Sequence, residues 1–121
     1  MKLRLKGNSI RLRLTQREVE GLVRLGVVWE VVEFGPSHAR FTYGIEADRK
    51  VESVRAEYAN DRMIVLIPEP QARQWAESGQ VGIEADLDGL RITVEKDFAC
   101  LKPRTDEDES DMFPNPVSAV C

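Results

Sequence analysis

Apolar and polar residues alternate in two short stretches near the start of the chain, around positions 3–5 and 10–14. A period of two is typical of a β-strand with one buried face. Gly7-Asn8 lies between the two stretches and favours a two-residue hairpin turn, because both residue types tolerate a positive φ. Two further strands are predicted near 27–34 and 39–47. This part of the chain therefore begins and ends with a pair of strands.

A helix is predicted between the two strand pairs. Its apolar residues share one face at helical spacing, namely Val19, Leu22 and Val23. Thr15 and Glu18 have the spacing of a capping box, in which each side chain accepts a hydrogen bond from the backbone N–H of the other residue. Gly26 follows the last apolar residue and favours the left-handed conformation that ends a helix. The predicted order is ββαββ.

The same order repeats at an offset of 53 residues. The strands of the second copy are predicted near 53–59, 62–67, 81–87 and 90–97. Pro70 stands in the first turn of its helix, where a missing backbone N–H costs nothing. Downstream of the helices the offset is 51, which aligns Phe41 with Ile92. Since neither copy alone buries much surface, we expect the copies, about 1–48 and 53–97, to share one core.

Three segments of these copies carry a family resemblance. Gly7–Leu14 is a strand that runs into a helix, Met63–Pro68 is a strand that ends in Ile-Pro, and Ser78–Ile83 is a glycine-containing step after a helix. They resemble the corresponding parts of the swapped-hairpin domains of the AbrB/MazE type. The resemblance implies a pseudo-dimer made from one chain, in which the hairpins of the two copies interleave.

The predicted fold is therefore α+β and mostly β. We expect the duplicated ββαββ units to form one swapped-hairpin-like, pseudo-dimeric barrel over residues 1–101. Residues 102–121 hold two basic and five acidic side chains and three prolines. Such a composition predicts an irregular, acidic C-terminal tail without a core of its own.

Members of the AbrB/MazE-type family are transcription regulators and antitoxins that contact DNA through basic residues of the first hairpin. Carried over to this chain, the resemblance implies that Arg4 and Arg11 have this role. The second copy has Glu57 and Ile64 at the matching positions. The basic face is therefore confined to the first copy.

The two ends of the chain carry a second resemblance. Lys-Gly-Asn-Ser at 6–9 precedes Arg-Leu-Arg-Leu at 11–14, and Cys-Leu at 100–101 precedes Phe-Pro-Asn-Pro at 113–116 and Cys121. The chain resembles an uncharacterised group of short bacterial proteins with this beginning and end. This resemblance implies a common family and no particular chemistry.

Charge is distributed unevenly along the chain. Residues 1–24 hold seven basic and two acidic side chains, whereas the whole chain has 17 basic and 21 acidic residues and a net charge of −4. In the predicted hairpin Arg4 faces Arg11 and Lys2 faces Arg13, all on one side of the ribbon. Like charges opposed across two strands are destabilising, so another group must offset them. The predicted anion-contacting residues are Lys2, Arg4, Lys6, Arg11, Arg13 and Arg17.

Two kinds of partner satisfy such a face. One is an external acidic partner, either a protein or a nucleic-acid backbone such as DNA. The other is internal, and the carboxylates predicted on neighbouring strands are Glu30, Glu33, Glu46, Glu84, Asp86 and Glu95. The sequence leaves both open, although the lack of aromatic residues near the patch disfavours a platform for single strands.

Within the tail, Met112, Phe113 and Pro114 form an apolar stretch behind the acidic run 106–111. This pattern suits an extended segment that docks into a groove. The groove belongs either to a partner or to the chain's own domain. A third alternative is that the acidic run covers the basic hairpin.

Cys100, Cys121 and His38 carry the alternative hypothesis of a thiol- or metal-binding protein. Cysteine and histidine together suit zinc or another thiophilic metal. The two cysteines also have the alternatives of a disulfide that fastens the tail, or of one small buried side chain and one free thiol.

The sequence disfavours several protein classes. It has no nucleophile elbow, phosphate-binding glycine loop or His-Glu-x-x-His spacing. It has no apolar run long enough to span a membrane and no pattern of a signal peptide, and two cysteines fit a cytoplasmic protein. Trp29 and Trp75 are predicted to anchor the core. We expect a non-enzymatic binding or regulatory protein without a cofactor, either a monomer or a homodimer.

Overall fold

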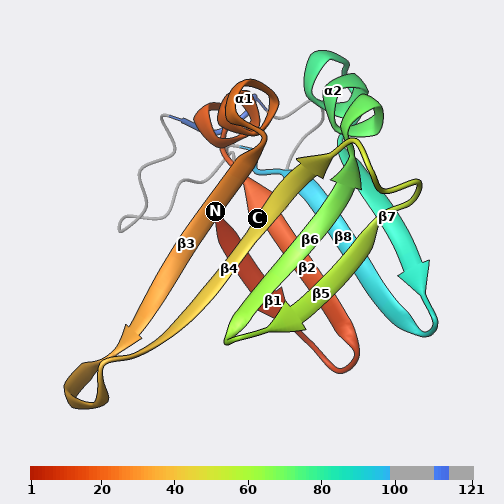
Figure 1. Cartoon of the computed structure of the whole chain (residues 1–121). Coiled ribbons are helices and arrows are strands. Elements are labelled where there is room, and N and C mark those ends of the chain that lie inside the picture. Colours follow the sequence, from red (N-terminus) through yellow and green to blue (C-terminus); the bar gives the residue numbers. More distant parts are fainter. Residues whose placement is uncertain (99–110, 115–121) are drawn as a thin grey trace.

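The computed structural model describes residues 1–98 and 111–114 of the chain (Figure 1). The first half contains β1 (Lys2–Leu5), β2 (Ser9–Leu14), α1 (Gln16–Leu25), β3 (Val27–Phe34), the 3₁₀ turn η1 (Gly35–Ser37) and β4 (Ala39–Asp48). The second half contains β5 (Arg55–Ala59), β6 (Arg62–Pro68), α2 (Glu69–Glu77), β7 (Gly82–Leu87) and β8 (Leu90–Lys96). The fold is α+β and mostly strands, and the predicted order ββαββ occurs twice.

The strands form two four-stranded sheets, and each sheet receives one hairpin from each half of the chain. Sheet A has the order β1-β2-β8-β7, and sheet B has the order β3-β4-β6-β5. The central pairs, β2 with β8 and β4 with β6, are parallel, and the outer pairs are antiparallel. The two similar sheets indicate an internal repeat.

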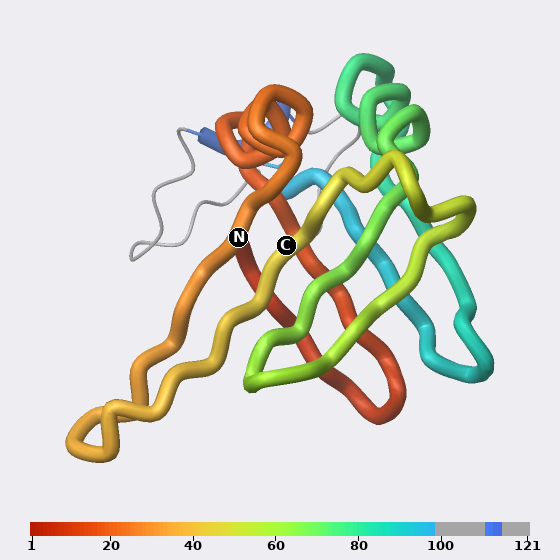
Figure 2. The backbone as a smooth tube through the Cα atoms, in the orientation of Figure 1, coloured from red at the N-terminus to blue at the C-terminus, as the bar shows by residue number. Residues whose placement is uncertain are grey.

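The closed barrel expected from the sequence is not found among the described residues. There, β1 and β7 remain the edges of sheet A, and β3 and β5 remain the edges of sheet B. Both helices lie at one end of the sheets, and the β3–β4 hairpin runs away from the body of the fold (Figure 2). Because this hairpin diverges, its edge strand meets no neighbour that would close a ring.

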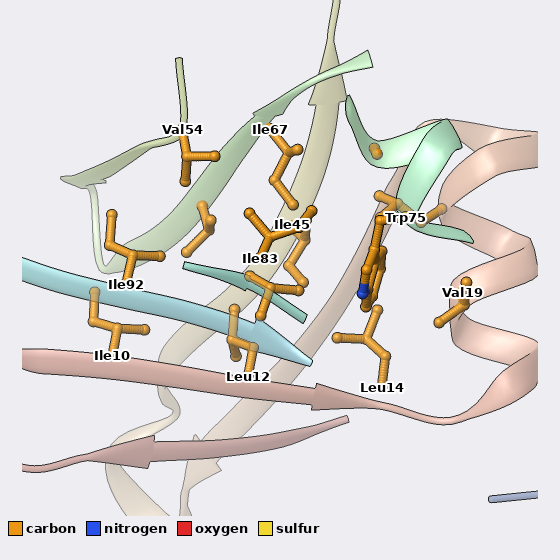
Figure 3. Packing of buried hydrophobic residues seen from close by; sticks show 14 of the residues in the cluster. Ile10, Leu12, Leu14, Val19, Ile45, Val54, Ile67, Trp75, Ile83 and Ile92 are labelled. Carbon is orange, nitrogen blue, oxygen red and sulfur yellow. The ribbon is translucent and has the colours of Figure 1, made fainter. Parts of the chain in front are cut away.

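The inner faces of the two sheets and one face of each helix enclose the core (Figure 3). The fully buried residues of the four central strands include Leu12, Ile45, Val65 and Val94. Trp75 of α2 is also fully buried, as predicted, and its indole N–H donates to the carbonyl oxygen of Val81 at 3.1 Å. The core is therefore a joint product of both halves of the chain.

Trp29 does not anchor the core, so this prediction is wrong. The residue lies on the outer face of sheet B with 46% of its surface exposed. The guanidinium of Arg62 lies 4.4 Å from the ring centroid. A Cβ at Gly44, the residue opposite on β4, would lie 2.3 Å from Cδ1 of Trp29. Glycine at this position therefore makes room for the indole over the neighbouring strand.

The start and end of α1 confirm the local predictions. The hydroxyl of Thr15 accepts from the backbone N–H of Glu18 at 3.4 Å, and the Glu18 carboxylate accepts from the backbone N–H of Thr15 at 2.9 Å. Gly26 has a φ of 83° and donates its N–H to the carbonyl oxygen of Leu22. The helix therefore ends where its sequence indicates.

The pairing registers define which residues of the two sheets are equivalent. Val94 pairs with Leu12 in sheet A, and Ile45 pairs with Val65 in sheet B. Leu12 and Val65 have the predicted offset of 53, so Val94 is equivalent to Ile45 at an offset of 49. The predicted offset of 51 for these strands is therefore wrong by two residues. The β3–β4 hairpin is longer than the β7–β8 hairpin, and turn positions alone did not reveal the difference.

Candidate anion-binding site

The basic hairpin has the predicted register. Arg4 pairs with Arg11, and Lys2 pairs with Arg13. Ile10, Leu12 and Leu14 on the same ribbon are buried, so the basic side chains lie on the outer face of sheet A. The hairpin therefore opposes like charges across its two strands, as the sequence predicted.

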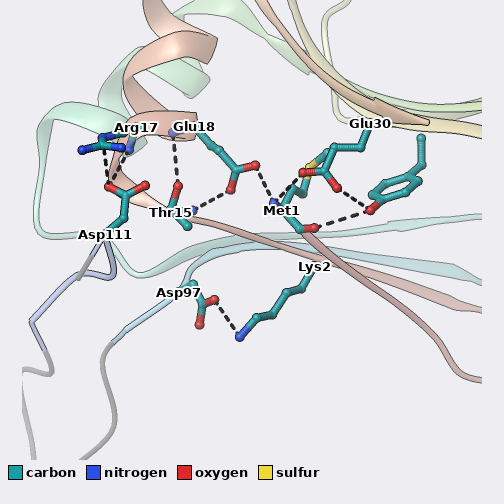
Figure 4. A network of polar contacts seen from close by, with 9 residues as sticks. Met1, Lys2, Thr15, Arg17, Glu18, Glu30, Asp97 and Asp111 are labelled. Atoms are coloured by element: carbon teal, nitrogen blue, oxygen red, sulfur yellow. Dashed lines mark hydrogen bonds and ion pairs between the residues drawn. The ribbon is translucent and has the colours of Figure 1, made fainter. Parts of the chain in front are cut away.

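Internal carboxylates neutralise the end of this face nearest to α1. Nζ of Lys2 lies 3.2 Å from Asp97, and Nε of Arg13 lies 2.6 Å from Glu95. Arg17, on the first turn of α1, lies 3.9 Å from Asp111 (Figure 4). Internal carboxylates thus lie within 4 Å of the three predicted anion-contacting residues at this end.

The end of the face near the Gly7-Asn8 turn is different. Within the described residues, the side chains of Arg4 and Lys6 have no ion-pair or hydrogen-bond partner. Nε of Arg11 lies 3.8 Å from Glu95, a carboxylate already held more closely by Arg13. Positive charge therefore remains uncompensated at this end.

These side chains line a pocket of about 420 Å³ on the outer face of sheet A, which we call the sheet A pocket. Its lining residues are Arg4, Lys6, Ser9, Ile10, Arg11, Glu84, Arg91 and Thr93. Four of them are basic and one is acidic, and Glu84 lies 3.9 Å from Arg91. The lining suits an anionic group with several acceptor oxygens.

Sequence reasoning missed Arg91. The residue reaches the pocket because β8 lies beside β2 in parallel, which pairs Arg91 with Ser9. Two hydrogen bonds between the hairpin turns fix this register. The side-chain amide of Asn8 donates to the carbonyl oxygen of Gly89 at 2.9 Å. The backbone N–H of Arg91 donates to the carbonyl oxygen of Asn8 at 3.0 Å. Only the pairing of strands far apart in sequence could have pointed to this residue.

Glu30, one of the carboxylates expected to neutralise the hairpin, has another role (Figure 4). It accepts hydrogen bonds from the Tyr43 hydroxyl and from the α-amine of Met1, the latter at 2.9 Å. Glu18 accepts a second hydrogen bond from the same amine. The network therefore ties β1, α1 and sheet B together.

This network shifts three pKa values. Burial raises the pKa of Glu30, but the hydrogen bonds from Tyr43 and the Met1 amine outweigh it, and the net pKa lies below the usual value. Burial and the hydrogen bond to Glu30 raise the pKa of Tyr43 to about 12. Burial lowers the pKa of the Met1 amine, yet its hydrogen bonds to Glu18 and Glu30 raise it overall. The folded state thus favours ionised Glu30 and neutral Tyr43.

The described part of the tail lies on the chain's own domain. Met112 is buried, and the backbone N–H of Phe113 donates to the carbonyl oxygen of Asp97 at 2.8 Å. The ring of Phe113 meets that of Phe98 edge-on, with centroids 5.8 Å apart. Pro114 is exposed. Among the predicted alternatives for this segment, intramolecular docking is the one observed for Met112 and Phe113.

Lys96 is a buried cation near this segment. Its Nζ donates to the carbonyl oxygen of Ser78, at the C-terminal end of α2, at 2.7 Å. The same atom lies 5.9 Å from the ring centroid of Trp75 and 5.3 Å from that of Phe113. Burial lowers the pKa of Lys96. These contacts give the residue a structural role at the end of the helix.

Of the three residues of the thiol or metal hypothesis, only His38 lies within the described structure. Cys100 and Cys121 lie outside the described residues. His38 follows η1 at the tip of the β3–β4 hairpin, exposed, with a φ of 56°. Within residues 1–98 and 111–114, no group of three His, Cys, Asp or Glu side chains is arranged to hold a metal ion. The hypothesis stays a prediction.

The chain matches a known family over nearly its whole length. The match covers residues 1–117, and the family is described as a family of unknown function, DUF7009. No curated protein and no solved structure matches the chain. Among the described residues, no helix is long and apolar enough to cross a membrane.

Proposed function

The chain belongs to the family of unknown function DUF7009, and we propose that it is a non-enzymatic binding protein that contacts an acidic partner through the sheet A pocket. The observation that carries the proposal is the uncompensated charge of Arg4 and Lys6 beside Arg11 and Arg91. Like charges that face one another across β1 and β2 destabilise the hairpin, and a bound anion relieves this cost. Phosphate and carboxylate groups are the anions that such side chains hold best.

The partner to test first is duplex DNA. Arg4 and Arg11 are the residues that match basic positions of the AbrB/MazE-type regulators, and both line the pocket. The contribution of each half of the chain to both sheets also supports a swapped-hairpin pseudo-dimer. The equivalent positions of sheet B hold Glu57 and Ile64, so one such face per chain is proposed. A regulatory or antitoxin-like role follows from this proposal.

The proposed contact involves only some of the residues that the sequence predicted. Lys2, Arg13 and Arg17 do not line the pocket, and each has a carboxylate within 4 Å, so they are left out of the proposed contact. The contact residues that remain are Arg4, Lys6, Arg11 and, newly, Arg91. The number of contact residues predicts how steeply DNA affinity falls with salt concentration, because each phosphate contact contributes to this dependence.

Fluorescence anisotropy with labelled random-sequence duplex DNA tests the proposal. Four contacts to phosphates give a slope of about −3 to −4 for log K against log salt concentration between about 50 and 200 mM. The double variant Arg4→Glu/Lys6→Glu is expected to abolish binding. The control Lys50→Glu/Arg55→Glu makes the same charge change away from the pocket, and we expect it to bind like the original chain.

Two results contradict the DNA proposal. One is no binding by the unchanged protein at the lower salt concentration. The other is an equal loss of affinity in both double variants, because this indicates net charge rather than a site. A parallel titration with an acidic peptide distinguishes a protein partner from DNA. Suppose that only the peptide binds and that only Arg4→Glu/Lys6→Glu abolishes this binding. The sheet A pocket is then supported as the binding site, with an acidic protein and not DNA as its partner.

A further inference from the structure

The β3–β4 hairpin exposes large apolar side chains on both of its faces. On β3, Val27, Trp29 and Val31 point to the outer face of sheet B and are 37%, 46% and 52% exposed. Val32 and Phe34 point to the opposite face and are 40% and 56% exposed. The hairpin projects from the body of the fold (Figure 1), and these five side chains keep a large part of their surface exposed.

The backbone of β3 is also open along one edge. The backbone N–H of Ala47 donates to the carbonyl oxygen of Gly26 at 2.8 Å. Since hydrogen-bonding direction alternates along an antiparallel strand, the even-numbered residues of β3 point their N–H groups toward β4. The N–H and C=O groups of Trp29, Val31 and Glu33 therefore point to the open edge.

Soluble proteins rarely leave such an edge unprotected. Edge strands are usually short or interrupted by proline, a bulge or a charged side chain. β3 has eight residues without proline or lysine, and its two charged residues are Glu33 and Glu30, the latter already held by Tyr43 and the Met1 amine. Contiguous exposed apolar patches on a monomer are likewise uncommon unless they bind something. The edge and the apolar side chains coincide on β3, so one partner satisfies both.

We propose that β3 is the interface with a second copy of this chain, and that the two β3 strands pair antiparallel about a two-fold axis at Val31. In this register Trp29 faces Glu33 of the second copy, and Val28 faces its Phe34. The two Val31 residues form a hydrogen-bonded pair, as their edge-directed backbone groups require. Sheets B of the two copies then join into one continuous eight-stranded sheet.

Charge selects this register. Because only the odd-numbered residues of β3 direct their backbone groups to the open edge, the two-fold axis must pass through a residue and not between two residues. Axes at Glu30 and at Val31 pair the most residues, seven of the eight in β3. An axis at Glu30 would oppose two carboxylates, which is unfavourable. An axis at Val31 places Glu30 opposite Val32 and Glu33 opposite Trp29, so no carboxylate faces another. The strand is therefore complementary to itself, which is what a two-fold interface requires.

The exposed apolar area of β3 supplies part of what a dimer interface needs. The five exposed apolar side chains of β3 present on the order of 400 Å² per copy, about half of the roughly 800 Å² that each partner contributes to a standard interface. Backbone pairing and the tip of the hairpin add to this area. The dimer goes beyond the proposed function, and it would place two sheet A pockets in one particle, which strengthens binding to a long polyanion.

Sedimentation equilibrium of the full chain from about 1 to 100 µM tests the dimer. We expect a dimer that the variant Val31→Pro converts to a monomer, because proline removes the N–H that bonds the second copy. Proline is tolerated on an edge strand when this N–H faces solvent, so the monomer is expected to stay folded. The matched control is Tyr58→Glu, which removes an apolar side chain, 66% exposed, from β5 at the opposite edge of sheet B.

Amide hydrogen exchange supplies a second readout that does not depend on a variant. Exchange at Trp29, Val31 and Glu33 is expected to slow at least tenfold between dilute and concentrated protein, whereas exchange in β8 stays constant. A monomer over the whole concentration range overturns the proposal, as does a dimer that Val31→Pro leaves intact. DNA binding is measured separately, so failure of the dimer and failure of the sheet A pocket are distinguishable.

Discussion

The outer faces of sheets A and B occupy equivalent places in a duplicated fold, yet equivalent strands carry different side chains. On the edge strands the equivalent residues are Gly82, Glu84 and Asp86 in sheet A and Val27, Trp29 and Val31 in sheet B. On the hairpins that begin each copy, Arg4 and Arg11 correspond to Glu57 and Ile64. The outer face of the β1–β2 hairpin is therefore basic, whereas the outer face of β3 is apolar from Val27 to Val31, although the strand order is the same.

The inner faces have not diverged in this way. Leu12 and Val94 in sheet A and Val65 and Ile45 in sheet B are fully buried at equivalent positions. A substitution on an inner face costs core packing, whereas the outer faces are free to acquire new partners. The comparison teaches that the two sheets share one kind of inner scaffold while their outer faces differ, and the two proposals assign a separate interaction to each outer face. Four changes test this division, and the largest effect comes first.

Truncation of an inner-face residue is expected to destabilise the fold whichever sheet carries it. Leu12→Ala is expected to lower the free energy of unfolding by about 2–5 kcal/mol, because it leaves a cavity in the core. Val65→Ala, at the equivalent position, costs less because fewer atoms are removed. Urea unfolding measures both, with Leu5→Ala, 59% exposed, as the control that changes little. A loss below about 1 kcal/mol for Leu12→Ala contradicts the shared core.

An added methyl group at Gly44 disturbs sheet B. Its Cβ would lie 2.3 Å from Cδ1 of Trp29 and 2.4 Å from the carbonyl oxygen of Val28. Gly44→Ala is therefore expected to cost about 1–3 kcal/mol and to change the fluorescence of Trp29. The equivalent residue of sheet A is Thr93, and Thr93→Ala needs no such adjustment. Equal effects of the two variants would contradict the close approach of Trp29 to β4.

Because of the network around Tyr43, sheet B makes the free energy of unfolding depend on pH. The equivalent residue of sheet A, Ile92, has no titratable group and makes no such contribution. Because folding raises the pKa of Tyr43 from 10 to about 12, the folded state binds more protons than the unfolded state in this interval. The contribution of Tyr43 to stability is therefore fully present below pH 10 and is lost as the pH rises to 12. The full shift corresponds to about 2.7 kcal/mol, but Tyr43 is partly exposed and solvent screens its interactions, so we expect a loss of about 1–2 kcal/mol by urea unfolding. Tyr43→Phe removes this part of the dependence, and an unchanged profile in that variant contradicts the assignment.

The smallest effect is expected from an ion pair on sheet A. Arg13 lies 2.6 Å from Glu95 but keeps 43% of its side chain exposed, so Arg13→Ala is expected to cost less than about 1 kcal/mol. The equivalent residue of sheet B, Leu66, is only 6% exposed, and Leu66→Ala is expected to cost more. Thermal unfolding of both variants checks the order. The opposite order would show that the paired charges contribute more than apolar burial.

Features with a local cause were predictable from the sequence. The capping box at Thr15, the end of α1 at Gly26 and the register of the basic hairpin depend on neighbouring residues, and all are confirmed. The contribution of each copy to both sheets was implied by the family resemblance rather than by any local pattern.

Features that depend on distant contacts were not predictable in the same way. Arg91 joins the basic face only because β8 lies parallel to β2. Trp29 and Trp75 look alike as apolar residues, but one projects from a divergent hairpin and the other fills the core. The prediction of a closed barrel was wrong for the same reason, since the direction of the β3–β4 hairpin depends on contacts between distant residues.

The most direct test of the division between the two outer faces measures DNA affinity and molecular mass together. Three proteins are compared: the unchanged chain, Arg4→Glu/Lys6→Glu and Val31→Pro. The account predicts that Arg4→Glu/Lys6→Glu loses DNA binding and stays a dimer, whereas Val31→Pro becomes a monomer that still binds DNA with a steep salt dependence. Loss of both properties in either folded variant would contradict the claim that the two faces act separately.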